Sequence, residues 1–193
     1  MNVAGVEIIP LGLDPRDTPF ERPAQPSVLL FGRLRRYKGL QTLLNAMGIV
    51  WESRPDVRLI ISGDGPEAAA VPDHPRIDFR PGYVPEQELD RLFAEASLVV
   101  LPYTQASQSG IGGLALARGI PVIVSDVGSL PDLAVDATFV VPAGSSEALA
   151  RAVLAHIDHG VASRQETLDL ARERFSWDAV ASTSLSLYES VAA

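Results

Sequence analysis

Short apolar runs alternate with longer amphipathic runs along the chain. Several of the short runs are apolar on both faces, which is typical of central strands in a covered parallel sheet. These runs predict strands at Val6–Pro10, Val28–Phe31, Val57–Ser62, Ile77–Arg80, Leu98–Leu101, Pro121–Ser125 and Thr138–Val141. The amphipathic runs predict helices at Gly39–Glu52, Glu86–Ala96, Glu147–Ile157, Arg164–Phe175 and Trp177–Val191.

This alternation of strands and helices predicts an α/β fold. In the first helical run, apolar residues recur with the period of a helix that buries one stripe. Strands that alternate with helices form right-handed βαβ units. We therefore expect a Rossmann-like, doubly wound parallel sheet with helices on both faces. With 193 residues, of which 47% are hydrophobic, the chain predicts a single domain over residues 1–193. Residues 1–26 would form a first strand and a loop, and 177–191 a C-terminal helix.

The overall charge excludes several classes of partner. The net charge of −8 repels nucleic acid and anionic lipid, so an anionic ligand would need a local site. The chain has no cysteine, which excludes disulfides and thiolate metal sites. It shows neither a signal sequence nor eighteen consecutive apolar residues, so we expect a cytoplasmic protein without direct membrane insertion.

The stretch FGRLRRYKGL, residues 31–40, places four cations in six positions of this acidic chain. It follows a predicted strand, at the sheet edge where doubly wound folds bind ligands. Gly32 would let the chain turn close to a ligand, while Arg33 and Lys38, the only lysine, would suit a diphosphate. For Arg35 and Arg36 alone, a solvated basic loop is the better interpretation.

A second candidate site is the glycine-rich stretch QSGIGGLALARGIPVIVSD, residues 108–126. Its glycines resemble a dinucleotide-binding fingerprint, and Asp126 lies sixteen positions after Gly110. However, six or seven loop residues precede these glycines, and the helix before the next strand has room for about two turns. The fingerprint is therefore weak evidence, although a helix N-terminus at Ser109 and Gly110 would still suit a phosphate.

Five motifs occur in a familiar order. They are FGRLRRYKGLQTLLNA, RLIISGDGP, IDFRPGYVPEQELDRLFAEASLVVLPY, QSGIGGLALARGIPVIVSDVGSLPDL and FSWDAVASTSLSLYESV. Together they resemble the C-terminal half of family 4 retaining glycosyltransferases, which have the two-domain GT-B fold. The opening VEIIPLGLDP resembles the hinge-proximal strand at which that half begins. The resemblance covers nearly the whole chain.

The resemblance implies a nucleotide-sugar donor site. Arg33 and Lys38 would hold the diphosphate and stabilise its charge as the glycosidic bond breaks. Backbone groups of Gly82, Tyr83 and Val84 would meet the base. The remaining substrate-binding candidates would cap the phosphates and border the sugar, and they are Gly32, Gln108, Ser109, Gly110 and Ile111. The resemblance implies neither a metal ion nor another cofactor.

The chain departs from the family pattern at two positions. Where the family carries the two acids of an E-x7-E element, this sequence has Ala106 and Leu114. Some members that resemble this chain carry QSG instead, so the departure alone does not predict inactivity. Gln105 or Gln108 could supply part of the missing hydrogen bonding.

The resemblance also implies a partner, because the acceptor site of the family lies on an N-terminal domain. We expect that domain in cis or in trans, and we expect the isolated chain to be inactive. Membrane association, if any, would come through that absent half. Two alternatives stay open: an NAD-type dinucleotide-binding domain, and a catalytically inactive regulatory module with the same fold.

Overall fold

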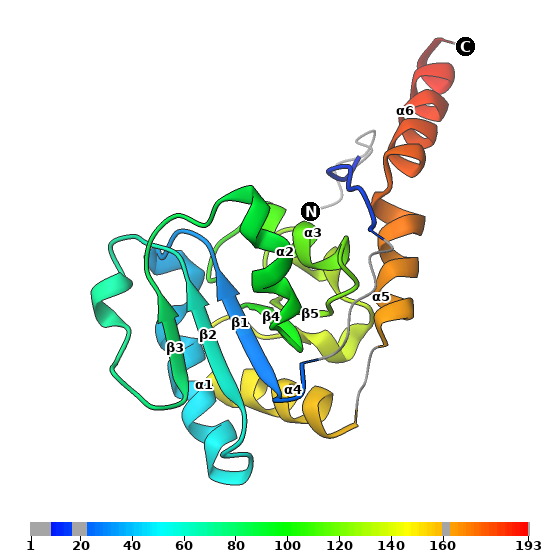
Figure 1. Cartoon of the computed structure of the whole chain (residues 1–193). Helices are drawn as coiled ribbons and strands as arrows, with labels where there is room; N and C mark the ends of the chain where they lie inside the picture. Colours follow the sequence, from blue (N-terminus) through cyan, green and yellow to red (C-terminus); the bar gives the residue numbers. More distant parts are fainter. Residues whose placement is uncertain (1–8, 17–22, 160–162, 193) are drawn as a thin grey trace.

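A computed structural model describes residues 9–16, 23–159 and 163–192 (Figure 1). Its centre is a parallel sheet whose strands run in the order β3-β2-β1-β4-β5-β6. The strands are β1 (Ser27–Phe31), β2 (Arg58–Ser62), β3 (Ile77–Arg80), β4 (Leu98–Leu101), β5 (Val122–Ser125) and β6 (Val140–Val141). This order belongs to the doubly wound Rossmann-like class, which confirms the predicted fold.

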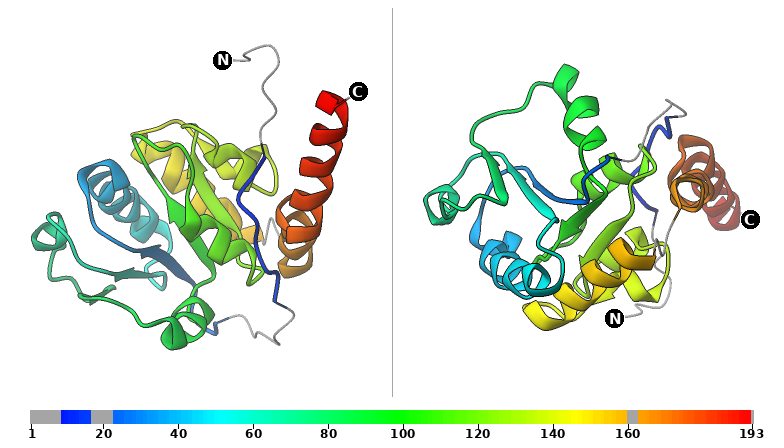
Figure 2. Two further views of the ribbon diagram at one scale, coloured as in Figure 1. Left: turned by 90° about the horizontal axis from the view of Figure 1, so that it is seen from above. Right: turned by 60° about the horizontal axis from the view of Figure 1, so that its bottom comes forward.

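Two layers of helices cover the sheet (Figures 1 and 2). On one face α1 (Leu40–Ser53) lies beside α4 (Ser146–His159). The other face carries α2 (Glu86–Ala94) and the short α3 (Gly110–Leu116). Both central strands, β1 and β4, are almost wholly buried between the layers, as their unbroken apolar sequences predict.

The winding of the sheet reverses between β1 and β4. The chain leaves β1 toward β2 on one side, and β4 pairs with the other side of β1. Loops that leave the carboxyl ends of two such strands diverge and open a crevice. Here those loops are residues 32–39 and 102–109, so the fold brings the two glycine-containing motifs together.

The C-terminal helices form an arm beside the sheet. After α5 (Arg164–Leu170) come a π-helical turn (Ala171–Phe175) and α6 (Trp177–Ala192), which points away from the sheet (Figure 1). The N-terminal segment 9–16 runs alongside, and the Leu13 N–H donates to the Phe175 carbonyl at 2.6 Å. None of the helices in the described part of the chain has the length and apolar character needed to cross a membrane.

Most predicted elements match the observed ones to within two residues at either end, and three differences need comment. Residues 6–8 of the expected strand Val6–Pro10 lie outside the described residues, and residues 9–10 are not in a strand. The strand expected at Thr138–Val141 starts only at Val140, because the Asp136 carboxylate accepts from the Thr138 N–H at 2.7 Å and holds a 3-10 turn. The helix expected at Arg164–Phe175 changes to π geometry after Leu170.

Candidate functional site

The loop after β1 carries Lys38 into the protein. Gly39 makes this possible, because its φ of 71° and the Pro102 carbonyl oxygen, 1.8 Å from where a Cβ would stand, exclude any side chain. The residues before it form a 3-10 turn, Arg36–Lys38. As a result the side chain of Lys38 is only 8% exposed.

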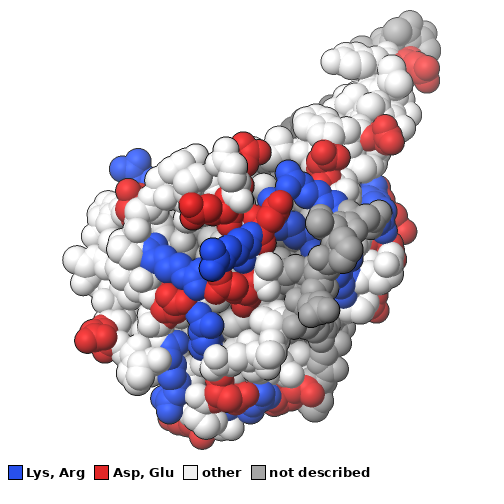
Figure 3. All heavy atoms as spheres, viewed as in Figure 1, with Lys and Arg blue, Asp and Glu red and all other residues white. Residues whose placement is uncertain are grey.

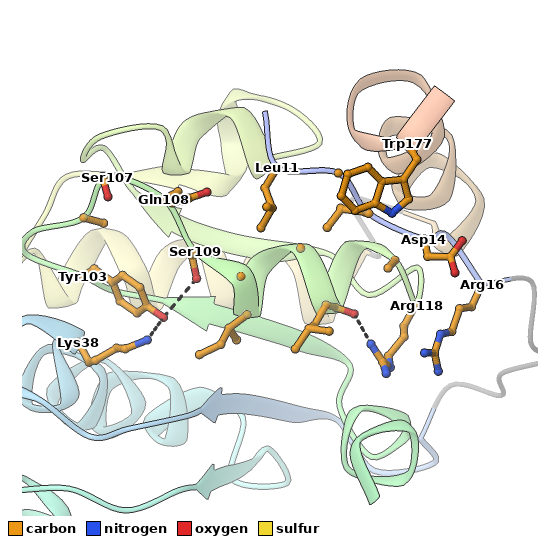
Figure 4. Close-up of a pocket in the computed structure, with 18 of the residues that line it drawn as sticks. Leu11, Asp14, Arg16, Lys38, Tyr103, Ser107, Gln108, Ser109, Arg118 and Trp177 are labelled. Atoms are coloured by element: carbon orange, nitrogen blue, oxygen red, sulfur yellow. Dashed lines mark hydrogen bonds between the residues drawn. The ribbon is translucent and has the colours of Figure 1, made fainter. Parts of the chain in front are cut away.

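Lys38 meets residues from the β4 side of the crevice (Figure 4). Its Nζ lies 2.5 Å from the Tyr103 hydroxyl oxygen, which is 3.5 Å from Ser109 Oγ. No carboxylate in the described part of the chain forms an ion pair with Lys38. Burial lowers the pKa of Lys38 to about 8 and raises the pKa of Tyr103 to about 12. The site therefore holds a buried amine without a counter-charge.

Helix α3 begins beside this amine. Ser109 is its N-cap and accepts from the Gly112 N–H at 3.4 Å. Gly112 and Gly113 are needed for packing, since a Cβ on them would stand 2.5 Å from Leu133 and 2.6 Å from Leu13. A Cβ on Gly110 would meet nothing within 4 Å. The first residue of the helix thus borders open space with a backbone N–H that no helical carbonyl can reach.

These groups line a cleft of about 880 Å³. Its far end is formed by Arg16, Arg118 and Trp177 (Figure 4). Both arginines donate to the Asp90 carboxylate, Arg16 at 3.0 Å and Arg118 at 2.8 Å. Their charge is therefore partly neutralised, whereas that of Lys38 is not. Ala106 and Leu114, the two positions at which the sequence departs from the pattern it resembles, also line this cleft.

A second cleft of about 680 Å³ lies at the carboxyl ends of β2 and β3. Gly82, Tyr83 and Val84 form part of its wall, and Tyr83 is 86% exposed. Arg80 is held at its edge by the Glu95 carboxylate at 2.6 Å.

Elsewhere on the face shown in Figure 3, basic and acidic side chains are interspersed, without a continuous basic surface there.

The structure gathers most of the predicted site residues at the reversal of the sheet. Lys38, Gln108, Ser109, Gly110 and Ile111 all line the larger cleft. Gly32 lies against Ile111, whose Cδ1 would be 2.6 Å from a Cβ on Gly32. The three residues 82–84 line the second cleft instead.

Arg33 does not join this group. Its side chain is exposed and lines neither of the two clefts.

Sequence reasoning also missed Tyr103, the neighbour of Lys38. A signal was present, because Tyr103 is the one aromatic residue between β4 and α3, at the ligand-binding edge of the sheet.

The glycine-rich stretch has the geometry expected from its spacing. Helix α3 has seven residues, about two turns, and begins nine positions after the end of β4. Asp126 lies outside both clefts, and its carboxylate accepts from the Ala143 N–H at 2.8 Å. The acid that a dinucleotide would use on its ribose therefore holds a turn of the backbone.

The described residues contain no group of three or more His, Asp or Glu side chains placed to hold a metal ion.

Comparison with solved structures identifies the class of fold. The C-terminal domain of a glycosyl transferase group 1 family protein from Francisella tularensis superposes with a TM-score of 0.65, at 21% identity over 81% of this chain and 89% of that one. The Anabaena protein HepE in complex with UDP and glucose gives 0.69, at 20% identity over 88% of this chain and 48% of that one. The fold is that of the C-terminal domain of a GT-B glycosyltransferase.

Sequence comparison identifies the family. The family model described as "Glycosyl transferases group 1" matches residues 25–159, and the chain belongs to this family. Phosphatidyl-myo-inositol mannosyltransferase of Mycobacterium leprae is 30% identical over 200 residues, which cover 97% of this chain and 52% of that protein. The chain spans about half the length of the curated relatives it matches.

Proposed function

We propose that this chain is the donor-binding half of a retaining family 4 glycosyltransferase, which transfers a sugar from a nucleoside diphosphate sugar to an acceptor. The observation that carries the proposal is the buried Lys38 ammonium, which lines the cleft and lacks an ion-pair partner among the described residues. A diphosphate would supply the missing negative charge. Ser109 and the N–H of Gly110 would donate to the same phosphates.

The chemistry asked of these residues is electrostatic. As the bond between the anomeric carbon and the phosphate oxygen breaks, negative charge grows on the departing diphosphate. Donors fixed in advance stabilise that charge without reorganising during the reaction. Lys38 is the principal donor in this proposal, and Arg33, exposed at the start of the same loop, would approach the diphosphate from solvent. No metal ion takes part.

The second cleft would receive the nucleotide base. Gly82, Tyr83 and Val84 offer backbone groups there, and the exposed ring of Tyr83 offers a surface for stacking. The solved neighbour HepE, whose complex contains UDP and glucose, supports a nucleotide in this fold. The sugar would lie toward Gln108 and Ile111.

The acceptor would come from a partner. Since the curated relatives are about twice as long as this chain, we propose that an N-terminal acceptor domain, in cis or in trans, closes the crevice from the other side. Transfer requires a donor and an acceptor in near-attack geometry with water excluded. The isolated chain is therefore expected to bind nucleotide without transferring sugar. A cytoplasmic location fits the absence of cysteine.

Calorimetric titration with UDP, GDP, ADP and NAD tests the proposal. We expect binding of at least one nucleoside diphosphate and a weaker response to NAD. Binding of NAD alone would favour a dinucleotide domain. The absence of binding by all four would favour a regulatory module, the reading that Ala106 and Leu114 support.

A further inference from the structure

We propose that Tyr103 is a positioning residue that fixes Lys38 and Ser109 relative to each other, so that both donate to the same phosphate group. This inference rests on the function proposed above and extends it to a residue outside the lysine loop. Three separate segments meet at the hydroxyl of Tyr103 (Figure 4). Lys38 ends the 3-10 turn after β1, Tyr103 follows β4 by two positions, and Ser109 caps α3. The hydroxyl thus joins the two sides of the crevice.

The directions of the hydrogen bonds follow from the chemistry of the donors. An ammonium can only donate, so the Tyr103 oxygen accepts from Lys38 at 2.5 Å. The tyrosine O–H can then donate to Ser109 Oγ, 3.5 Å away, which also accepts from the Gly112 N–H. Within the described part of the chain this leaves the Ser109 proton and two Lys38 protons available. Both side chains line the same cleft, so these protons can serve one ligand.

The ring of Tyr103 is held as firmly as a core residue. Tyr103 is 2% exposed, and its ring stands edge-on to Tyr37, with centroids 5.9 Å apart. Phenylalanine would fill the same space but could not accept a hydrogen bond. The Tyr103→Phe change therefore removes the hydrogen-bond acceptor of the Lys38 ammonium and leaves the ring and its packing in place.

The effect of the Tyr103 hydroxyl on Lys38 can be measured through the pKa of the amine. Among the described residues, two titratable side chains face the amine: the ring centroid of Tyr37 lies 5.7 Å from Nζ and that of Tyr103 lies 4.2 Å from it. Asp14, Arg16 and Arg118 line the same cleft, where the two arginines contact Asp90. Without the Tyr103 oxygen the charged amine loses its acceptor, and the pKa of Lys38 should fall further.

A single lysine allows a direct test. Lysine labelled with 13C gives one side-chain signal, whose pH titration reports the pKa of Lys38. In wild type we expect a midpoint near pH 8, as burial dictates. In Tyr103→Phe it should move down by about one pH unit, the scale of one hydrogen bond to a charged group. The matched control Tyr37→Phe, which removes a hydroxyl without a described contact to Lys38, should keep the wild-type midpoint. An unchanged midpoint in Tyr103→Phe would overturn the proposal.

Ligand binding supplies the second arm, with inorganic pyrophosphate, UDP and GDP titrated from pH 6 to 10. Affinity should fall above the Lys38 midpoint, and in Tyr103→Phe it should be about tenfold lower at pH 8, with the fall beginning at lower pH. A loss of affinity that is equal at every pH would indicate a purely structural role and contradict the proposal. Tyr103-dependent binding of pyrophosphate, with neither nucleotide bound by wild type, would uphold this inference and reject the proposed function.

Discussion

The two clefts at the carboxyl edge of the sheet are built in opposite ways. In the larger cleft Lys38 and Tyr103 are buried, and hydrogen bonds join Lys38 through Tyr103 to the half-buried Ser109. In the smaller one Tyr83 is 86% exposed, and Gly82 has open space where a Cβ would stand. Hydrogen-bond donors whose positions are fixed before the ligand binds suit a diphosphate, because its charge is stabilised best by donors in the correct geometry. An exposed loop suits the flat face of a nucleotide base, because stacking depends on contact area more than on exact direction.

The largest expected effect is on the free energy of unfolding, and it distinguishes two glycines with positive φ, one beside each cleft. A Cβ at Gly39 would stand 1.8 Å from the Pro102 oxygen, whereas at Gly82 it would meet nothing within 4 Å. We expect Gly39→Ala to lower the free energy of unfolding by more than about 3 kcal/mol and Gly82→Ala by about 1–2 kcal/mol, from backbone strain alone. Urea unfolding of both variants checks this. Equal losses would show that the larger cleft is no more tightly built than the smaller.

Gly110 allows the backbone donor at the larger cleft to be removed cleanly. Proline is well tolerated at the first position of a helix, and the extended Ser109 before it is compatible with proline. Gly110→Pro should therefore delete one N–H and weaken nucleoside diphosphate binding by about 2 kcal/mol. Gly110→Ala keeps the N–H and has open space for its methyl group, so its affinity should match wild type. Calorimetry with UDP or GDP compares the two, and a proline variant with wild-type affinity would remove α3 from the phosphate site.

The ion pairs beside the smaller cleft should matter for stability. Hydrogen bonds from Arg80 lower the pKa of Asp78 and of Glu95. Carboxylates with lowered pKa values stabilise the fold above their unfolded values, near pH 4, and lose that effect as the pH falls further. Arg80→Met should therefore cost about 1 kcal/mol at pH 7, since these side chains are about one-third exposed, and less at pH 3. Thermal unfolding of the variant at pH 7 and at pH 3 checks this, with Arg91→Met, which removes an exposed arginine, as control. A loss of stability that is larger at pH 3 than at pH 7 would contradict the stabilising role of these ion pairs.

The smallest expected effect on binding belongs to Asp126. Because its carboxylate holds the Ala143 N–H outside both clefts, Asp126→Ala should leave nucleotide affinity unchanged and cost about 1 kcal/mol of stability. Titration of the variant with UDP, GDP and NAD measures this. A clear loss of affinity would restore the dinucleotide interpretation, in which an acid binds the ribose.

The sequence predicts the sheet well because its inner strands are buried on both faces. The bounds expected for β3 and β4 are those observed. For β4 an unbroken apolar run leaves little choice of element, whereas β3 alternates apolar and charged residues, which is typical of a half-buried strand. Turns held by single side chains were harder to predict, as with the Asp136 turn that shortens β6. At the site, residue type alone indicated Lys38. It could not show that Tyr103, sixty-five positions away, meets Lys38, because that contact depends on the order of the strands.

The central claim is that the larger cleft holds a diphosphate through Lys38, and titration of Lys38→Met with UDP and GDP tests it most directly. Methionine keeps most of the buried side chain and removes the charge. Arg35→Met removes an exposed cation from the same loop and serves as the matched control. We predict that Lys38→Met weakens binding by about 1–3 kcal/mol, or roughly 5- to 150-fold, while Arg35→Met changes it little. Equal affinities in wild type and Lys38→Met would contradict the account.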